Sequence, residues 1–301
     1  MTGYRGAADL AAMQAALAAW IQHGGDCGFC HAGDLPHRLY NGLRGRYPLD
    51  ELVRLWHDAD GIGAFAIVYP DQSGYDAFVS PAQRGTDLER HVLDWGYETS
   101  RRWMDQEGYA ADPVQTDVHT CDETRAALLR DLGYEPEGKP WLAIGERPLG
   151  GTLPPVELPE GYTIRAARGE EDDGQLQAVH NAAFDSDWAG DEYLDQVMRQ
   201  PGYDPALEQV VVAPDGTFAA FCIVWLDAGN KVGLFEPVGT HAAHQRMGLG
   251  RAIMAHGLDL MRQRGMQRAQ VGWEMDNPAS DGLYAALGFE PKHRLTAYGK
   301  M

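Results

Sequence analysis

Cysteine and long apolar runs are both scarce in this sequence. Only 4 of its 301 residues are cysteine, so disulfides are not expected to contribute much to stability. The longest apolar stretches, such as residues 218–226, are far too short to span a bilayer. Residues 1–20 are rich in alanine but lack the basic start and the cleavage site of a secretory signal. We therefore expect a cytoplasmic protein that does not enter a membrane.

Basic residues are also in the minority. The chain has 25 Lys and Arg against 44 Asp and Glu, which gives a formal net charge of -19. A surface this acidic repels phosphate backbones and anionic lipid heads, which argues against nucleic acid or a membrane as a partner. It would attract a cationic small molecule such as an amine or polyamine, although solubility alone also explains the charge. The 44% hydrophobic composition is globular, and the length favours two domains.

Two segments of the chain resemble each other. Residues 122–136 read DETRAALLRDLGYEP and residues 277–291 read NPASDGLYAALGFEP. Each predicts a short helix that ends at a glycine and is followed by an aromatic residue that opens a strand. Upstream, each half has a strand, a turn and a long helix: residues 77–80, Arg84 and 88–107 in the first, and 232–240, 245–250 and 252–264 in the second. This shared order favours a duplicated domain over a solenoid, whose repeats are much shorter.

The second half predicts a mixed α/β domain around one central sheet. Helices are expected at residues 173–184, 192–199, after Gly250 and before Gly288, and strands at 162–166, 209–213, 218–226, 231–240, 268–273 and as a final pair within 289–300. Residues 147–155 are rich in proline and glycine, which is typical of a linker. We therefore expect tandem domains at residues 1–147 and 158–301, joined by residues 148–157, each with a mixed sheet flanked by helices.

One turn in the second half carries the clearest chemical signal. The run Gln245-Arg-Met-Gly-Leu-Gly-Arg251 lies where a strand ends and a long helix begins. Gly248 and Gly250 permit positive φ angles and close backbone approach, so several amides can point at one anion. The helix N-terminus adds the positive end of its dipole, and the two arginines add charge. No Lys-Ser/Thr pair follows and a third glycine is missing, so neither a Walker loop nor a dinucleotide turn fits.

The surroundings of this turn resemble a known family. The strand segment Glu236-Pro-Val-Gly-Thr240 before it, and Asn277 and Leu283-Tyr-x-x-Leu-Gly-Phe289 after it, are similar to the GNAT superfamily of acyl-CoA-dependent N-acetyltransferases over residues 162–300. The resemblance implies two central strands that splay apart, with the pantetheine arm of acetyl-CoA in the gap and its pyrophosphate on the turn. The residues it implies for binding this co-substrate are Val238, Thr240, Gln245, Arg246, Met247, Gly248, Leu249, Gly250, Arg251 and Asn277.

Amine acylation needs a neutral amine, a polarised thioester carbonyl and a proton for the departing thiolate. The resemblance places the Val238 amide at the thioester oxygen and Tyr284 beside the CoA sulfur as general acid, with a core aromatic as the alternative. Glu236 precedes Val238 by two residues, so strand alternation predicts that both face the acceptor cleft. We expect Glu236 to act as general base, directly or through water, unless it forms an outward ion pair. His241 and His244 lie beside the turn, where either could shuttle protons; a surface position or a contact with CoA is the favoured alternative.

The first half lacks these features. Aligning the two turns sets Asp87 and Glu89 opposite the two glycines, so carboxylates would repel a pyrophosphate by roughly a few kcal/mol at an effective dielectric of about 20. Leu129 falls opposite Tyr284, so the general acid is missing as well. We therefore expect residues 1–147 to form a degenerate GNAT-like domain that does not bind acetyl-CoA.

Cysteine and histidine cluster near the N-terminus without forming a familiar motif. Cys27-Gly-Phe-Cys30-His31 spells the c-type haem attachment pattern, but no export signal precedes it. A zinc site would use Cys27, Cys30, His31 and His37, whose spacing matches no familiar finger. We expect buried or partly exposed thiols there, core positions for Cys121 and Cys222, and no metal.

The sequence as a whole predicts an acyltransferase that moves an acetyl group from acetyl-CoA to a primary amine by direct attack. The tandem layout is similar to that of family members that modify small molecules, which favours an amine-bearing sugar or another small metabolite as acceptor. A peptide or protein amine is the alternative acceptor, and a non-catalytic acyl-CoA sensor is the alternative function. A monomer or a homodimer is expected.

Overall fold

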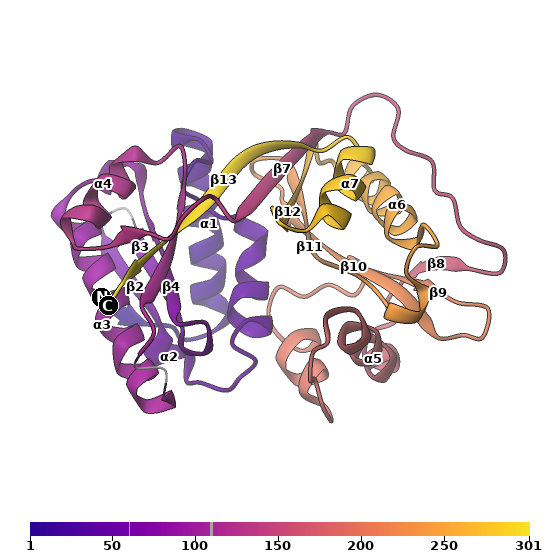
Figure 1. Ribbon diagram of the computed structural model, residues 1–301, viewed down its shortest axis with the longest axis horizontal. Helices are drawn as coiled ribbons and strands as arrows, with labels where there is room; N and C mark the ends of the chain where they lie inside the picture. Colours follow the sequence, from indigo (N-terminus) through magenta and orange to yellow (C-terminus); the bar gives the residue numbers. More distant parts are fainter. Residues whose placement is uncertain (60, 109–110) are drawn as a thin grey trace. The chain divides into compact units, whose positions relative to one another are not determined.

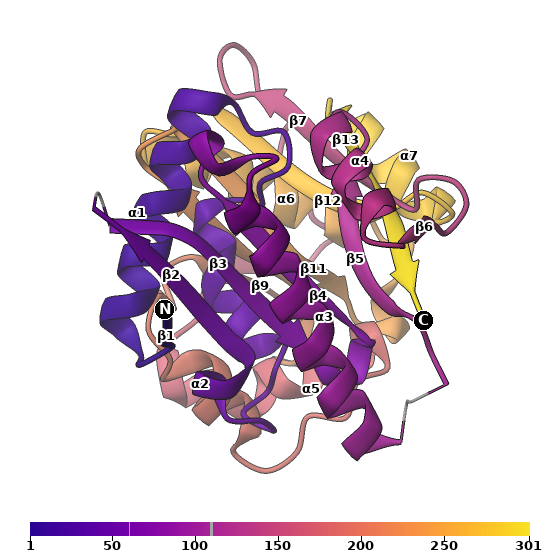
Figure 2. The same cartoon turned by 90° about the vertical axis from the view of Figure 1, so that its left-hand side faces the viewer.

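Figures 1 and 2 show the computed structural model of the protein, which describes residues 1–59, 61–108 and 111–301. The chain forms two compact units, and each has a mixed sheet flanked by helices, so the predicted fold class is confirmed. The first unit is Met1–Ala143 with Glu274–Asp276 and Lys292–Met301, and the second is Ile144–Trp273 with Asn277–Pro291. Within these described ranges, no helix has both the length and the apolar composition that a membrane span requires.

The first unit is built on a sheet whose central strand is apolar along most of its length. Its strand order is β1 (Thr2–Gly3), β2 (Val53–Asp58), β3 (Gly61–Tyr69), β4 (Gly74–Val79), β5 (Val114–His119) and β13 (Glu290–Lys300), with β6 (Glu135–Pro136) paired to β13. Neighbours are antiparallel except β4 and β5. Helices α1 (Ala7–Gly24) and α3 (Asp87–Glu107) cover opposite faces of β3, which explains its continuous burial (Figure 2). Shorter helices are α2 (Leu49–Leu52), α4 (Glu123–Asp131), η1 (Ala32–Asp34), η2 (His37–Asn41), η3 (Pro70–Gln72) and η4 (Pro81–Gln83).

The second unit repeats this plan. Its strand order is β7 (Leu142–Pro148), β12 (Arg268–Glu274), β11 (Val232–Thr240), β10 (Phe218–Asp227), β9 (Glu208–Val212) and β8 (Thr163–Ala166). Strands β8 to β11 pair antiparallel, and β11 pairs parallel with β12. Helices α5 (Asp173–Phe184) and α6 (Leu249–Gln263) cover opposite faces of β10 (Figure 1). The remaining helices are α7 (Pro278–Ala286), η5 (Gly169–Asp172), η6 (Leu194–Met198) and η7 (Ala242–His244).

Helix α6 packs closely on the sheet of the second unit. Five residues spaced along one face of this helix are all buried: Ile253, Met254, Gly257, Leu258 and Met261. A Cβ atom at Gly257 would lie 2.4 Å from the Phe235 ring, so the glycine permits this close approach. The helix that follows the predicted turn is therefore fixed against β11, the strand that precedes the turn.

The same succession of elements occurs twice, as strand, long helix, strand and short helix: β4–α3–β5–α4, then β11–α6–β12–α7. After α4 the chain passes through β6 into β7, and after α7 it enters β13. Strand β7 neighbours β12, and β13 pairs with β5. The compact units therefore differ from uninterrupted halves of the sequence, because residues 144–147 belong to the second unit and residues 292–301 to the first. The pair of strands expected within residues 289–300 is wrong, since β13 runs as one strand without a turn.

The expectation for two of the cysteines is also wrong. Cys27 and Cys121 form a disulfide across 94 positions of sequence, and Cys121 is exposed rather than in the core. Their Cα atoms lie 6.3 Å apart because the end of β5 meets the loop after α1, which is within the range that a disulfide bridges. Cys30 and Cys222 are free and buried, as expected.

Candidate active site

The two parallel strands at the centre of the second unit pair over only part of their length. Strands β11 and β12 are in register from Val232 opposite Arg268 to Phe235 opposite Val271. In the part of the chain that the structure describes, β11 has no partner on β12 beyond Phe235, although it continues to Thr240 beside β10. This separation agrees with the splayed strands that the family resemblance implies.

The backbone amides of Val238 and Thr240 face the side of β11 where β12 has separated. The His241 amide donates to the Ala219 carbonyl at 2.9 Å, which continues the register in which Thr240 lies opposite Ala220. Hydrogen-bonded and non-hydrogen-bonded pairs alternate along antiparallel strands, so Val238 and Thr240 occupy the non-hydrogen-bonded positions. Their N–H groups therefore point away from β10, into the open side, where an extended amide-containing chain can accept hydrogen bonds from them.

Glu236 lies at an irregularity in the same strand. The register with β10 shifts between the pairs Cys222–Val238 and Val224–Phe235, so β11 bulges at Glu236 and Pro237. The Trp225 indole N–H donates to the Glu236 carbonyl at 2.5 Å and fixes the bulge. The prediction that strand alternation directs Glu236 and Val238 to one face is wrong, because a bulge interrupts the alternation. The Glu236 side chain is half-buried and carries its charge close enough to affect Tyr284.

The predicted anion-binding turn is exposed and its helix is uncapped. Gly248 is the N-cap of α6 with φ 82°. No side chain of residues 1–59, 61–108 or 111–301 caps this end of the helix, and its first turn contains no acidic residue. Gly250 lies inside the helix, so of the two glycines only Gly248 adopts a positive φ, and Arg246 is left-handed with φ 62°. The N–H groups of a first helical turn have no intrahelical partner. An anion at this point would meet those donors and the positive end of the helix dipole.

Side-chain hydrogen bonds support the turn from both sides. The Tyr162 hydroxyl lies 3.0 Å from His244 Nδ1 and 3.7 Å from the Met247 sulfur. His241 Nδ1 accepts a hydrogen bond from the Ala243 amide at 3.1 Å and so caps η7. His241 therefore holds the backbone of η7, and His244 ties the turn to Tyr162. Tyr162 has no sequence signal of its own because it reaches the turn from 82 residues away.

A cavity adjoins the turn on the side of the linker. It has a volume of about 240 Å³ and is lined by Pro155, Glu157, Leu158, Pro159, Met247, Gly248, Arg251 and Ala252. Arg251 forms an ion pair with Glu157 at 3.5 Å, and both side chains are largely exposed. Exposed pairs of this kind contribute about 0–1 kcal/mol. Arg251 can therefore exchange Glu157 for a phosphate at little cost.

Helix α7 carries the predicted acid. Tyr284 is 7% exposed, and burial together with the negative charge of Glu236 raises the pKa of its hydroxyl to about 12. Its ring lies 5.3 Å from Trp273 and 6.2 Å from Phe289, centroid to centroid. The structure thus brings Glu236 and Tyr284 into one electrostatic environment and keeps the phenol protonated at neutral pH.

Asn277 begins the same helix. Its side-chain oxygen accepts hydrogen bonds from the amides of Ala279 at 3.2 Å and Ser280 at 3.3 Å, so it is the N-cap of α7. The residue is exposed. Because the cap uses the oxygen, the side-chain NH₂ is the group with which Asn277 can contact a ligand.

The equivalent turn of the first unit is occupied by a carboxylate of the protein itself. Glu89 is fully buried in the first turn of α3, where it accepts a hydrogen bond from the Gly85 amide and forms an ion pair with Arg125. A second acidic residue, Asp87, lies in the same turn. Leu129, at the position that corresponds to Tyr284, is fully buried in the core. This turn therefore holds an internal anion where the turn before α6 is open.

Comparison with known proteins identifies the family of this chain. Residues 175–289 match the model of the acetyltransferase (GNAT) family. A mycothiol acetyltransferase from Nocardia farcinica is 30% identical over 258 residues, which cover 80% of this chain and 80% of that protein. Another from Rhodococcus erythropolis is 34% identical over 249 residues, with 77% of each chain covered.

Solved structures extend the match to the whole fold. A GCN5-related N-acetyltransferase from Sphaerobacter thermophilus has a TM-score of 0.65 at 21% identity and covers 100% of this chain and 95% of its own. A tandem GNAT protein from the clavulanic acid biosynthesis pathway has a TM-score of 0.64 at 16% identity, with 98% and 94% covered. The chain therefore belongs to the GNAT family of acetyltransferases and is an acyltransferase of the tandem type.

Proposed function

We propose that the second unit transfers an acetyl group from acetyl-CoA to a primary amine of a small molecule by direct attack. The observation that carries this proposal is the combination of two donor sets on one strand–turn–helix segment. Val238 and Thr240 direct amides into the open side of β11, and the exposed, uncapped turn at Gly248 follows them. The first set suits the amides of pantetheine and the second suits a diphosphate.

The binding energy available at the turn is sufficient for a carrier of this kind. A hydrogen bond to a charged oxygen contributes about 1.5–3 kcal/mol, and micromolar affinity requires about 8 kcal/mol. A few amides of the turn from Gln245 to Gly250, with the charges of Arg246 and Arg251, supply that amount. The Asn277 side-chain NH₂ adds a donor for the pantetheine arm.

The chemistry we propose uses three groups of the second unit. The lone pair of a neutral amine attacks the thioester carbonyl, and the Val238 amide stabilises the oxyanion that forms. Glu236 takes the proton of the amine, directly or through a water. The tetrahedral intermediate then breaks its C–S bond, and Tyr284 donates its proton to the departing CoA thiolate. No covalent enzyme intermediate is required, since Cys222 is buried and no other cysteine lies in this sheet.

The acceptor is proposed from charge and from the relatives. A net charge of -19 attracts a cationic amine. The relatives from Nocardia and Rhodococcus are named mycothiol acetyltransferases, which puts amines related to mycothiol first among the acceptors to test. Amino sugars come next, and peptide N-termini serve as the alternative acceptor class.

For the first unit, we propose a degenerate GNAT-like domain that does not bind acetyl-CoA. Glu89 supplies the anion at the turn before α3, and its ion pair with Arg125 would have to break before a diphosphate could enter. On this proposal residues 1–147 support the fold, residues 148–157 link the halves, and residues 158–301 carry out catalysis. The full chain is expected to bind acetyl-CoA with a stoichiometry of one.

The test is an acceptor panel with the full chain. Acetyl-CoA is incubated with mycothiol-related amines, amino sugars, polyamines and a short peptide, and both free CoA and the acetylated product are measured. The proposal expects at least one small amine to give stoichiometric amounts of both. If only the peptide is acetylated, the acceptor is a peptide amine and not a small molecule. Tight binding of acetyl-CoA without acetylation of any amine would favour an acyl-CoA sensor.

A further inference from the structure

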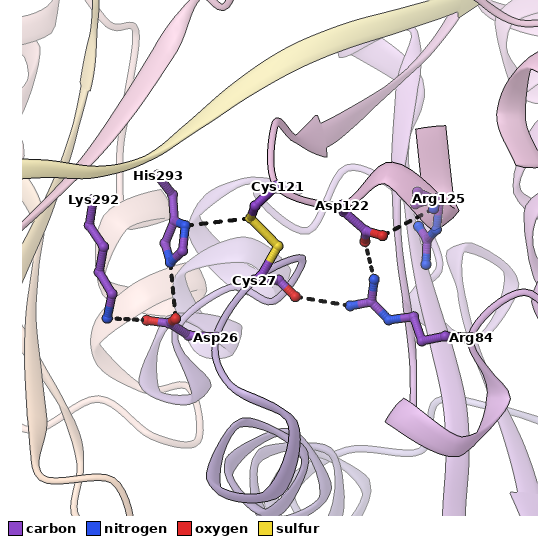
Figure 3. The surroundings of a disulfide bond; sticks show 8 residues. All are labelled: Asp26, Cys27, Arg84, Cys121, Asp122, Arg125, Lys292 and His293. Atoms are coloured by element: carbon purple, nitrogen blue, oxygen red, sulfur yellow. Dashed lines mark hydrogen bonds and ion pairs between the residues drawn. A yellow bond between two sulfur atoms is a disulfide. The ribbon is translucent and has the colours of Figure 1, made fainter. Parts of the chain in front are cut away.

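The strongest unassigned cluster of chemically active side chains lies in the first unit, around the disulfide (Figure 3). Cys27, His119 and Cys121 each present a possible metal ligand, and these three atoms lie within 4.8 Å of one another. Tetrahedral zinc with Zn–S bonds of about 2.3 Å and Zn–N bonds of about 2.0 Å places its ligand atoms roughly 3–4 Å apart. The histidine nitrogen therefore already lies within reach of both sulfurs, which are bonded to each other and can separate once they are reduced.

A fourth ligand stands next to them. Figure 3 shows His293 pointing at the disulfide, with Nδ1 3.6 Å from the Cys121 sulfur. The rings of His119 and His293 lie 5.2 Å apart, centroid to centroid. Two sulfurs and two imidazoles make the Cys₂His₂ set that is typical of structural zinc.

The other nitrogen of His293 is held as metal-bound histidines usually are. His293 Nε2 lies 3.0 Å from a carboxylate oxygen of Asp26, and the Lys292 ammonium is bonded to the second oxygen at 2.7 Å (Figure 3). A carboxylate that accepts the distal N–H of a histidine fixes the ring and makes Nδ1 the free, basic nitrogen. That nitrogen is the one that faces the Cys121 sulfur.

His119 supplies a second, independent sign that a ligand is missing. The residue is 7% exposed, and its Nδ1 is buried without a hydrogen-bond partner among the residues that the structure describes. A buried polar atom in that position loses about 1–3 kcal/mol of solvation unless something binds it. A cation bound between the sulfurs and the two histidines would give this cluster a role, and His119 Nδ1 has no hydrogen-bond partner in the part of the chain that the structure describes.

The two cysteine-bearing segments are held together by contacts other than the disulfide. The Arg84 guanidinium forms an ion pair with Asp122 and donates to the Cys27 carbonyl at 3.1 Å (Figure 3). Asp122 also caps α4 by accepting from the Arg125 amide at 3.0 Å. Gly28 has φ 80°, and a Cβ there would lie 2.5 Å from the Arg84 guanidinium, so the loop fits this clamp only as glycine. We therefore expect these contacts to keep the two segments together when the sulfurs are reduced.

We propose that reduction of the Cys27–Cys121 disulfide opens a Zn²⁺ site formed by both sulfurs, His119 and His293. Two equivalents of a low-molecular-weight thiol break the S–S bond, leave two cysteine thiols and are oxidised to their own disulfide. Zinc then binds both sulfurs as thiolates and releases two protons. Cys121 is exposed and Cys27 half-buried, so both the reductant and the ion have access. The oxidised chain holds the disulfide in place of the ion.

The first test measures zinc in the full chain after reduction with a phosphine, which does not compete for the metal. After exchange into zinc and removal of the excess, the reduced wild type is expected to retain one equivalent and the oxidised wild type none. Cys121→Ser and His119→Gln are expected to lose it. Cys222→Ser, which removes a free buried cysteine of the second unit, is the matched control and should retain it.

A second measurement separates a zinc site from a folding defect. Asp26→Asn keeps all four ligands but removes the charge that orients His293, so zinc affinity should fall about 10- to 100-fold. Cobalt in place of zinc should give the visible absorption of a tetrahedral ion with thiolate ligands, and circular dichroism of each variant checks its fold. The proposal is overturned if the reduced wild type retains no zinc, or if Cys121→Ser and His119→Gln retain as much as Cys222→Ser.

Discussion

Replacement of Tyr284 by phenylalanine isolates one hydroxyl of the proposed active site. Among the described residues this hydroxyl has no hydrogen-bond partner, and the ring contacts with Trp273 at 5.3 Å and Phe289 at 6.2 Å are retained by phenylalanine. The free energy of unfolding should therefore change by less than about 0.5 kcal/mol. If the stability is unchanged in this way, a loss of activity reports on the chemical step and not on folding.

The size of that loss follows from the pKa of the group. A pKa of about 12, raised by burial and by the charge of Glu236, keeps all but about 1 in 10⁴ of the phenols protonated at pH 8. The hydroxyl is thus available as an acid over the whole neutral range, and a positioned general acid contributes about 10²- to 10⁴-fold. We expect Tyr284→Phe to lower kcat by that factor and to leave the KM for acetyl-CoA within about 2-fold of the wild type.

The assay is steady-state release of CoA with an accepted amine, alongside urea unfolding of each variant. Tyr298→Phe removes another buried phenol, which accepts a hydrogen bond from Arg130 in the first unit, and serves as the matched control. Its kcat should match the wild type. A kcat for Tyr284→Phe within 3-fold of the wild type would refute the role of this hydroxyl as the acid, because general acid catalysis accounts for at least about 10²-fold.

Three further predictions concern other groups. Glu236→Gln should lower kcat by about 10²-fold without weakening acetyl-CoA binding. A kcat equal to that of the wild type would exclude Glu236 as the base. Glu89→Ala should destabilise the chain by about 3–5 kcal/mol in urea, because it leaves Arg125 buried without its partner, whereas Glu123→Ala at an exposed site should not. Burial raises the pKa of Asp117 to about 6, so the folded state binds more protons than the unfolded state between pH 4 and 6 and stability falls as pH rises. Asp117→Asn should therefore be up to about 3 kcal/mol more stable than the wild type above pH 6. In calorimetric melts this difference should disappear below about pH 4.

The sequence predicted the elements around the turn because their signals are local. The strand at residues 232–240 and the long helix after the turn at 245–250 follow from residue spacing, and the structure has them at Val232–Thr240 and Leu249–Gln263. The duplication was also visible, since Gly133 and Gly288 end equivalent helices. These features depend on neighbours within a few residues, which a single sequence contains.

Features that depend on distant pairing were not predicted. The placement of β7 beside β12 and of β13 beside β5 depends on strand pairing, and no residue pattern within 289–300 identifies β5 as the partner. The bulge at Glu236 interrupts the alternation of side chains that is expected from a regular strand, and the sequence carries no signal for it. The Cys27–Cys121 bond joins two positions 94 residues apart. Spacing along the sequence groups Cys27 with its near neighbours, whereas the fold places it beside His119.

The central claim is that the turn before α6 binds the diphosphate of acetyl-CoA. Calorimetric titration of acetyl-CoA into Gly248→Asp and Gly265→Asp tests it directly, because these glycines lie at opposite ends of α6 with φ 82° and 83° and open space around each Cβ. Both substitutions carry the same strain and charge, but only the first places a carboxylate at the proposed phosphate site. We predict at least about 100-fold weaker binding for Gly248→Asp and wild-type binding for Gly265→Asp. Equal affinities for the two variants would contradict the account.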